Sequence, residues 1–420
     1  MSASQEPRIW VEIGDLLRFF RESSTPAGIA RIQLEILPHL LDLAPERVAL
    51  FQVGGTSREI EFLGFDEVLK RCDNSAFLAK MGQMGRLYDV AQFLRQHLRN
   101  FAADLRLMVR RGDRGRFAEV VRPGDIVLNL GSSWSHRNFG RSIGELKRDY
   151  GVRFALLIHD VLPLAHRAFV SRSHRPLFDR WFADMAAVWD VILTPSFSSA
   201  REIRESLEQR GMAVPPIHRI GFGSGFTQTP MPPEPAARTH VLYVSTIEIR
   251  KNHRLLFEVW KRLIADHGAA AVPDLVFAGR FGWEIADLKR DLAATNYLDG
   301  KIRVIENLDD AELAAQYRAA HFTVFPSLCE GWGLPIGESL YFGRYCIAAD
   351  ATSIPEVGGV FVDYHPPRDV AAARRLIEAA LFEPGVLVEK ERRIREEFHP
   401  RTWRDTARDI LRALGATPKD

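Results

Sequence analysis

The sequence is poor in cysteine, in long apolar runs and in excess charge of either sign. Its 420 residues contain three widely spaced cysteines, Cys72, Cys329 and Cys346, which form neither a disulfide framework nor a zinc-binding pattern. No apolar run approaches the roughly 18–20 residues that a membrane-spanning helix needs. Lys and Arg number 56 against 54 for Asp and Glu, and the net charge of +2 gives no reason to expect a nucleic-acid partner.

The N-terminal segment, Met1 to Pro7, lacks the features of a targeting sequence. It has neither the apolar core of a signal peptide nor an arginine-rich transit pattern. We therefore expect a cytoplasmic protein whose thiols are buried as small apolar groups. Hydrophobic residues make up 46% of the chain, which is enough for a core in each of two or three domains.

Short apolar runs alternate along the chain with amphipathic helical patterns. This alternation predicts an α/β fold with parallel sheets and crossover helices. The candidate strands of a first series are Arg8–Ile13, Val48–Val53, Asp125–Leu130, Arg153–Ile158, Val191–Thr194 and Ile217–Gly221. Those of a second series are Val241–Ser245, Leu275–Ala278, Ile302–Ile305, Phe322–Phe325, Tyr345–Ala349 and Val360–Val362.

We expect these two series to form two doubly wound domains that face each other across a cleft. The first spans residues 1–226 and the second 240–397, with a Pro-rich linker at 227–239 and a helical segment at 398–420. Open parallel sheets bind ligands at the carboxyl ends of their strands, so both binding edges should lie on the cleft.

Residues 66–117 interrupt the first series with a helical pattern. Its apolar residues recur at steps of four and three, and eight arginines lie from Arg86 to Arg116. Such a helix can lie on the anionic inner face of a membrane. It can equally pack on its own domain or on a second subunit, with the arginines in solvent. We favour packing, and the membrane contact and the homo-oligomer stay open.

The most informative stretch runs from Phe325 to Glu338, with the sequence FPSLCEGWGLPIGE. A strand ends at Ser327, a loop with two glycines follows, and Pro335 suits the first turn of a helix. Free amides and the helix dipole at such a turn favour an anion, and a diphosphate fits this site. Glu330 on the loop and Glu338 in the first helical turn supply carboxylates, which accept hydrogen bonds from sugar hydroxyls.

A second stretch, Val241 to His253, combines a strand, a short loop and the start of a helix for which Asn252 is a candidate N-cap. Arg250 and Lys251 follow the strand, where cations can neutralise the charge of a departing diphosphate. Each stretch alone is also typical of a structural turn with solvated charges. Together, above one sheet, they favour a site for a sugar diphosphate.

These two motifs resemble the donor domain of family 4 retaining glycosyltransferases with the GT-B fold, in which two Rossmann-like domains face each other. The resemblance extends over most of residues 241–366. It includes Phe277–Trp283, Leu308–Leu313 and Ser353–Gly358. Within the family, the chain is most similar to bacterial polysaccharide and O-antigen transferases, many of them mannosyltransferases. The resemblance also implies that the C-terminal helix crosses back to the N-terminal domain.

The resemblance implies roles for the matching residues. Arg250 and Lys251 contact the diphosphate, Glu338 holds the ribose, and Glu330 contacts the donor sugar. Many members carry an arginine at the position of Thr246, and Arg250 would take over part of that role. The expected donor-binding residues are Glu338, Ser327, Gly331, Trp332, Gly333, Leu334, Gly28, Thr246 and Gly279.

The first half resembles the family more weakly. Gly28 matches a glycine loop that opens the first helix, although the second glycine of the pattern is an alanine here. His159, in Ile158–Leu164, matches a histidine that faces the cleft and hydrogen-bonds the donor sugar. The alternative for His159 is a structural histidine paired with Asp160.

Three further residues are candidates for the acceptor side of the cleft, namely Trp134, His136 and Asp160. Trp134 could stack on a sugar face, or it could be a rim aromatic that packs its own loop. The strand end Thr194–Ser196 is expected to contribute little.

The resemblance implies transfer with retention at the anomeric carbon, with the leaving phosphate as the base. No Asp-x-Asp motif lies near a strand end, so we expect neither a metal nor a cofactor. The expected partners are a nucleotide-sugar donor, with GDP-mannose favoured by resemblance alone, and a saccharide or lipid-linked saccharide acceptor of surface polysaccharide synthesis.

Two other activities stay open. The first is a nucleotide-sugar epimerase with the same fold. The second is an NAD-dependent oxidoreductase, whose glycine fingerprint has its nearest counterpart at Gly221–Phe226. That segment lacks the third glycine at the required spacing and leads into the Pro-rich linker.

Overall fold

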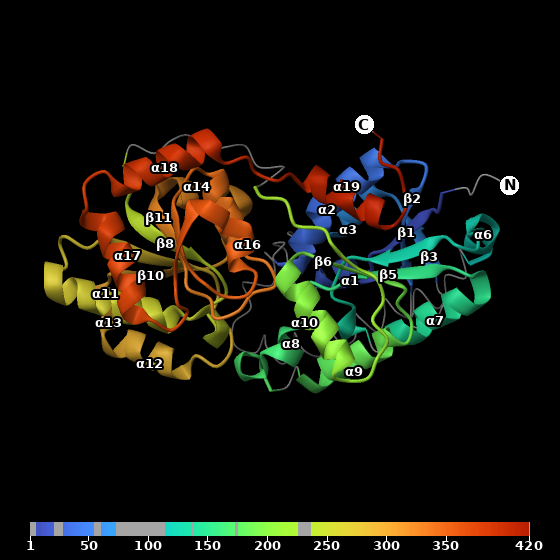
Figure 1. The fold of residues 1–420 in the computed structure, drawn as a ribbon, viewed down its shortest axis with the longest axis horizontal. Helices are drawn as coiled ribbons and strands as arrows, with labels where there is room; N and C mark the ends of the chain where they lie inside the picture. The colour runs from blue at the N-terminus through green and yellow to red at the C-terminus, as the bar shows by residue number, and fades with distance from the viewer. Residues whose placement is uncertain are drawn as a thin grey trace.

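The structure is a computed structural model of the chain. It describes residues 6–20, 28–53, 60–72, 114–136, 138–172, 175–225 and 237–419. Two lobes lie side by side, each built on its own sheet (Figure 1). The expected linker at 227–239 and the expected helical insertion at 66–117 fall largely outside the described residues.

The N-terminal sheet has the strand order β3-β2-β1-β4-β5-β6-β7. All neighbouring strands in it are parallel except β2 and β3, which pair antiparallel. Its strands are β1 (Ile9–Glu12), β2 (Val48–Val53), β3 (Ile60–Leu63), β4 (Ile126–Asn129), β5 (Arg153–Leu157), β6 (Val191–Thr194) and β7 (Ile217–Arg219).

The C-terminal sheet is parallel throughout, in the order β10-β9-β8-β11-β12-β13. Its strands are β8 (His240–Val244), β9 (Asp274–Ala278), β10 (Ile302–Ile305), β11 (Ala320–Phe325), β12 (Cys346–Ala349) and β13 (Val362–His365). Both sheets are therefore doubly wound, as the alternation of strands and helices predicts.

Two strand predictions need correction. The apolar run Val360–Val362 is not the last strand, because residues 359–361 form a 3₁₀ turn and β13 begins at Val362. Val360 is one of the most exposed apolar residues, at 69%. The strand β3 was not expected, since it is an edge strand of four residues in which the two end residues are buried and the two middle ones are not.

The helices of the N-terminal domain are α1 (Gly14–Phe19), α2 (Ile29–Leu43), α3 (Phe65–Cys72), α6 (Arg114–Val120), α7 (Phe139–Tyr150), α8 (Leu162–Ala165), α9 (Arg175–Ala186) and α10 (Phe197–Glu208). Those that follow β8 are α11 (His253–His267), α12 (Ala286–Ala294), α13 (Asn296–Asp299), α14 (Asp310–Ala319), α15 (Leu334–Tyr341), α16 (Ile354–Gly358), α17 (Val370–Phe382), α18 (Val386–Glu397) and α19 (Trp403–Ala413).

Helix α19 lies on the N-terminal domain, beside α2 (Figure 1). Thr402 and Asp405 form a capping box at its start. Its apolar face, which includes Trp403, Ala407 and Ile410, belongs to the same buried cluster as the core of β1 and α2. The last helix therefore ties the end of the chain to the first domain.

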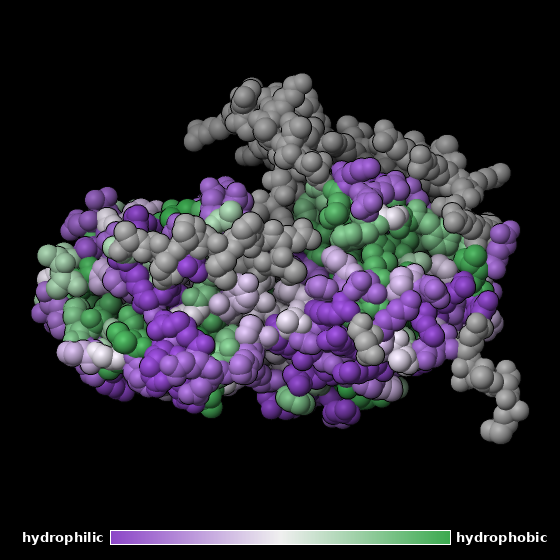
Figure 2. Space-filling model, turned by 90° about the horizontal axis from the view of Figure 1, so that it is seen from above, coloured by the Kyte–Doolittle hydropathy of each residue, from purple (hydrophilic) through white to green (hydrophobic). Residues whose placement is uncertain are grey.

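None of the described helices combines the length and the apolar character needed to cross a membrane. Figure 2 shows the upper face of the molecule, where most described side chains are hydrophilic and an apolar area lies on the N-terminal lobe.

Candidate active site

The glycine loop, residues 327–334, connects β11 to α15 at the carboxyl edge of the C-terminal sheet. It lies against the N-terminal domain at Gly331. A side chain there would place its Cβ 2.4 Å from the carbonyl oxygen of His159 and 2.8 Å from Cβ of Asp160. Only glycine permits this approach of the two domains.

Hydroxyl groups hold the loop's backbone from within its own domain. The Thr352 hydroxyl donates to the carbonyl of Glu330 at 2.9 Å and accepts from the Glu330 amide at 2.8 Å. The Ser353 hydroxyl lies 2.8 Å from the carbonyl oxygen of Glu330 and 2.9 Å from that of Trp332. The peptide groups that carry the carbonyls of Glu330 and Trp332 are therefore held within the C-terminal domain.

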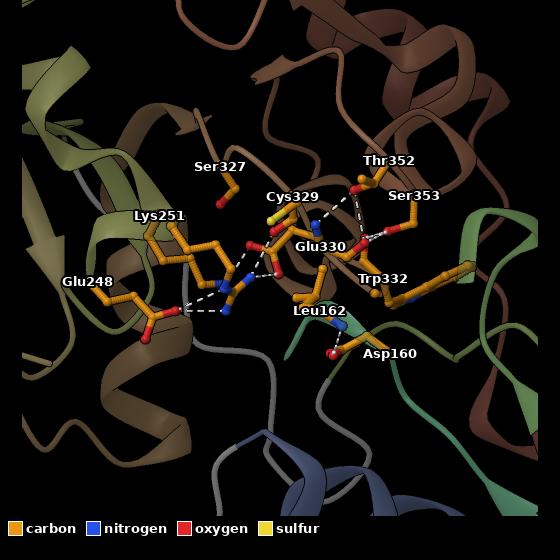
Figure 3. Close-up of polar contacts among 12 residues, drawn as sticks. Asp160, Leu162, Glu248, Lys251, Ser327, Cys329, Glu330, Trp332, Thr352 and Ser353 are labelled. Atoms are coloured by element: carbon orange, nitrogen blue, oxygen red, sulfur yellow. Dashed lines mark hydrogen bonds and ion pairs between the residues drawn. The ribbon is translucent and has the colours of Figure 1, made fainter. Parts of the chain in front are cut away.

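The carboxylate of Glu330 bridges two cations. Arg250 Nη1 lies 2.6 Å from one of its oxygens and Lys251 Nζ lies 2.5 Å from the other. Figure 3 shows Glu330 at the centre of these polar contacts, with Lys251 and Glu248 on one side and Thr352 and Ser353 on the other. Burial alone would raise the pKa of Glu330, but the two cations outweigh burial and lower the pKa to about 2. Glu330 is thus ionised across the physiological range.

Arg250 and Lys251 come from a 3₁₀ turn, Ile249–Lys251, between β8 and α11. A second carboxylate, that of Glu248, lies 2.8 Å from Arg250 Nη2, and its pKa is raised by burial. Burial and the neighbouring Arg250 lower the pKa of Lys251. These charges are held almost out of water, so an anion entering here would meet weakly screened cations.

Asn252 occupies the N-cap position of α11 but does not cap it. The residue is in the left-handed conformation, with φ of 56°, and its side chain makes no capping hydrogen bond. Its amide instead donates to the carbonyls of Pro326 and Pro367 at 3.1 and 2.8 Å. The helix therefore starts where predicted, with Asn252 at its N-cap position, but the side chain does not cap it and instead ties the loop after β8 to the loops after β11 and β13.

The amides of residues 331–334 donate to no oxygen of the part of the chain that the structure describes. They lie between the end of β11 and the start of α15. Free amides at a helix start are a favourable environment for phosphate or for hydroxyl oxygens. The loop therefore has the donors that an oxyanion requires, beside two cations.

Glu338 is the fifth residue of α15, which starts at Leu334, so it lies in the second helical turn and not in the first as expected. It is buried, and burial raises its pKa. Its carboxylate accepts from the Tyr317 hydroxyl at 2.7 Å and lies 3.7 Å from Arg31 of the N-terminal domain. Arg31 is also 2.5 Å from Asp310.

His159 lies at the end of β5 and is 7% exposed. Its Nε2 is 2.9 Å from the carbonyl of Leu130, whereas its Nδ1 has no partner among the described residues. Burial lowers its pKa to about 4, so the ring is neutral at pH 7. Asp160 does not pair with it, because the Asp160 carboxylate accepts from the Leu162 amide at 3.1 Å.

Three other expected donor residues, Gly279, Ser327 and Thr246, make contacts within the protein that explain their positions. A Cβ on Gly279 would lie 2.0 Å from the carbonyl oxygen of Ser245, so glycine lets the loops after β8 and β9 meet. Ser327 places its hydroxyl 3.1 Å from that of Tyr243. Thr246 is half-buried beside Gly282, whose Cβ would lie 2.9 Å from the Thr246 methyl group. Their contacts to a donor stay predictions.

On the N-terminal side, Gly28 precedes α2 with φ of 53°, and no atom lies within 4 Å of a Cβ built there. The ring of Trp134 lies 5.8 Å from that of Phe178 and 5.6 Å from that of Trp181. This packing agrees with the alternative in which Trp134 is a rim aromatic. His136 is half-buried, on the same loop. Acceptor roles for Trp134, His136 and Asp160 stay predictions.

Sequence reasoning missed several residues that join the domains, namely Arg31, Ser196, Ser199 and Glu356. It also missed Tyr317, which holds Glu338 within the C-terminal domain. Ser196 stands at a recognised strand end, and a serine before a helical pattern is an N-cap signal. Nothing in the sequence indicates that its partner lies in the other domain.

Residues 230–398 match the family described as glycosyl transferases group 1. The chain contains a group 1 glycosyltransferase domain. This domain spans the C-terminal sheet, the glycine loop and the 3₁₀ turn with Arg250 and Lys251. The two motifs singled out in the sequence therefore both lie in the matched region.

Two curated relatives that the chain matches over part of its length come from Escherichia coli. O-antigen chain mannosyltransferase B is 35% identical over 133 residues, which are 32% of this chain and 34% of that protein. Serotype-specific mannosyltransferase WbdA is 24% identical over 295 residues, which are 64% of this chain and 34% of that protein. The chain thus matches about a third of each relative's length.

Solved structures extend the comparison to both domains. Sucrose-phosphate synthase from Thermosynechococcus elongatus covers 97% of this chain and 98% of its own, with a TM-score of 0.61 and 17% identity. A glycosyltransferase from Rickettsia africae covers 98% of both chains, with a TM-score of 0.57 and 14% identity. At such identities the likeness shows the fold, and that fold is GT-B.

Proposed function

We propose that the chain is a retaining glycosyltransferase that moves a hexose from a nucleotide-sugar donor to a saccharide or lipid-linked saccharide acceptor. The observation that carries this proposal is the bridge of Glu330 to Arg250 and Lys251 beside the free amides of the glycine loop. A diphosphate needs the cations and amides, and a sugar needs the carboxylate.

In the proposed reaction the diphosphate binds at Arg250, Lys251 and the loop amides. The bond between the anomeric carbon and the leaving phosphate oxygen breaks, and the acceptor oxygen forms a new bond on the same face. The acceptor proton passes to the leaving phosphate. The cations and amides stabilise the charge that develops on that phosphate, and no metal takes part.

His159 is proposed to contact the donor sugar across the cleft. Its neutral ring offers an unprotonated Nδ1 that accepts a hydrogen bond from a sugar hydroxyl, because Nε2 is engaged by a carbonyl. Glu338, held by Tyr317, is proposed to accept from the ribose hydroxyls.

Mannose from GDP-mannose is the proposed donor, and a surface polysaccharide such as O-antigen is the proposed product. Support comes from the relatives, both of which are named as mannosyltransferases. We propose that the enzyme works in the cytoplasm. Membrane contact through residues 86–116 stays an alternative to packing on protein.

A thermal-shift screen with GDP, UDP, ADP and their sugars tests the donor, since a ligand that binds only the native state raises its melting temperature. We expect GDP and GDP-mannose to give the largest shifts. Analysis of products from labelled donor then separates transfer, which releases nucleoside diphosphate, from epimerisation. If no sugar nucleotide shifts the melting temperature at millimolar concentration, the proposal fails.

A further inference from the structure

The N-terminal domain holds one carbonyl of the glycine loop. The Ser196 hydroxyl donates to the carbonyl oxygen of Gly331 at 2.9 Å, and the Ser199 hydroxyl lies 3.2 Å from the same oxygen. Ser196 and Ser199 are both almost fully buried, so water does not compete for this carbonyl. The carbonyls of Glu330 and Trp332, in contrast, are held within the C-terminal domain by Thr352 and Ser353.

A planar trans peptide directs its N–H opposite to its C=O. Fixing the carbonyl of Gly331 therefore fixes the direction of the Trp332 amide. That amide donates to none of the described residues. Three consecutive peptide groups carry the carbonyls of Glu330, Gly331 and Trp332. Of these three, the one between Gly331 and Trp332 alone is oriented by the N-terminal domain.

A second contact holds the same helix start in place. The carboxylate of Glu356, at α16 of the C-terminal domain, accepts from the amides of Phe197 and Ser198 at 2.7 and 2.8 Å. The third amide of α10, that of Ser199, donates to Ser196 Oγ at 2.9 Å. The first turn of α10 is thus satisfied largely by a carboxylate from the other domain, in an orientation that the helix dipole favours.

We propose that Ser196 and Ser199 are positioning residues that orient the Trp332 amide toward the donor, and that Glu356 holds them in register when the domains are closed. The loop's full set of amide donors then exists only in the closed enzyme. Because of this coupling, the bond between the sugar and the diphosphate would break only when the N-terminal domain, which carries the acceptor side of the cleft, is docked on the glycine loop. The inference rests on the proposed function, because it assigns the amide to the donor.

The test is a double variant, Ser196→Ala with Ser199→Ala, compared with Ser196→Thr and with Thr402→Ala. Threonine at 196 keeps the hydroxyl, whereas Thr402→Ala removes an N-cap from α19, which packs beside α2. The measurements are the melting temperature, and kcat and KM for the donor at saturating acceptor.

We expect the double variant to lower kcat by about 10- to 100-fold, which is less than the loss of a whole oxyanion donor. Ser196→Thr should retain most of the wild-type kcat, and Thr402→Ala should lower the melting temperature with kcat within about twofold of wild type. If the double variant behaves like Thr402→Ala, the serines only cap a helix and the inference is overturned.

Hydrogen–deuterium exchange gives a readout that does not need turnover. Because the amides of residues 331–334 have no partner among the described residues, the readout is the protection that a bound nucleoside diphosphate gives to a peptide covering 327–334. Loss of the serine hydroxyls should lower that protection, and equal protection in wild type and the double variant overturns the inference. Failure of wild-type protein to bind or turn over any sugar nucleotide would instead remove the proposed function, so the two failures can be told apart.

Discussion

Replacing Glu330 by glutamine tests the charge arrangement of the site. The substitution keeps the size of the side chain but removes the negative charge between Arg250 and Lys251, which lie 2.6 and 2.5 Å away. Both cations are then left buried without their main counter-ion. Since an unpaired buried charge is costly, we expect a clear loss of stability at pH 7.

The shift in the pKa of Glu330 gives the size of the expected loss in the free energy of unfolding. A pKa lowered from 4.5 to about 2 corresponds to about 3 kcal/mol of stability at neutral pH. For a domain of this size, about 3 kcal/mol shifts the melting temperature by roughly 6–12 °C. Because the folded pKa is depressed, this stability is complete above pH 4.5 and is lost as the pH falls toward 2.

Thermal melts of wild type and Glu330→Gln at pH 7 measure the effect, with the exposed Glu383→Gln as a matched control. A nucleoside diphosphate without sugar should bind the Glu330→Gln variant at least as tightly as wild type, because its phosphates replace the missing charge. A melting temperature within 1 °C of wild type would show that the bridge carries no net stabilisation. Weaker binding of the diphosphate would refute the electrostatic account.

Three further predictions follow from single contacts. Tyr317→Phe should cost about 1–3 kcal/mol in urea unfolding, because it leaves buried Glu338 without its 2.7 Å hydrogen bond, and an unchanged midpoint would contradict this. Gly279→Ala should destabilise the domain more than Gly28→Ala, since only the former places a Cβ 2.0 Å from a carbonyl oxygen, and equal melting temperatures would contradict it. The His159 pKa of about 4 lies below its ordinary 6.5, so His159 should cost stability as the pH falls from 6.5 to 4. His159→Gln should flatten that part of the pH–stability curve, and an identical curve would exclude the buried neutral ring.

The strands could be predicted because each is a short apolar run between helical patterns. The register of the strands and the strands at the edges of the sheets were harder to predict. The run at 360–362 looks like a strand, but pairing with β12 begins at Val362, opposite Cys346. The strand β3 has four residues and lies at the edge of its sheet. Its burial results from pairing with β2 and is not indicated by a pattern in its own sequence.

In the candidate site, too, residues in local motifs could be predicted, whereas contacts between the domains could not. Glu330, Arg250 and Lys251 could be named because each lies in a local motif whose backbone pattern is visible in the sequence. The contact of Glu356 with the start of α10 joins residues 159 positions apart and exists only once both domains are folded and docked. Likewise, the partner of Ser196 at Gly331 is set by the closed arrangement of two sheets, which no local pattern encodes.

Transfer of labelled mannose from GDP-mannose to a saccharide acceptor, followed for wild type, Lys251→Ala and Glu330→Ala, tests the central claim most directly. We predict labelled product with wild type and turnover lower by orders of magnitude in both variants, with folding verified by circular dichroism. Near-normal turnover in both folded variants would contradict the assignment of the glycine loop and its two cations as the site of glycosyl transfer.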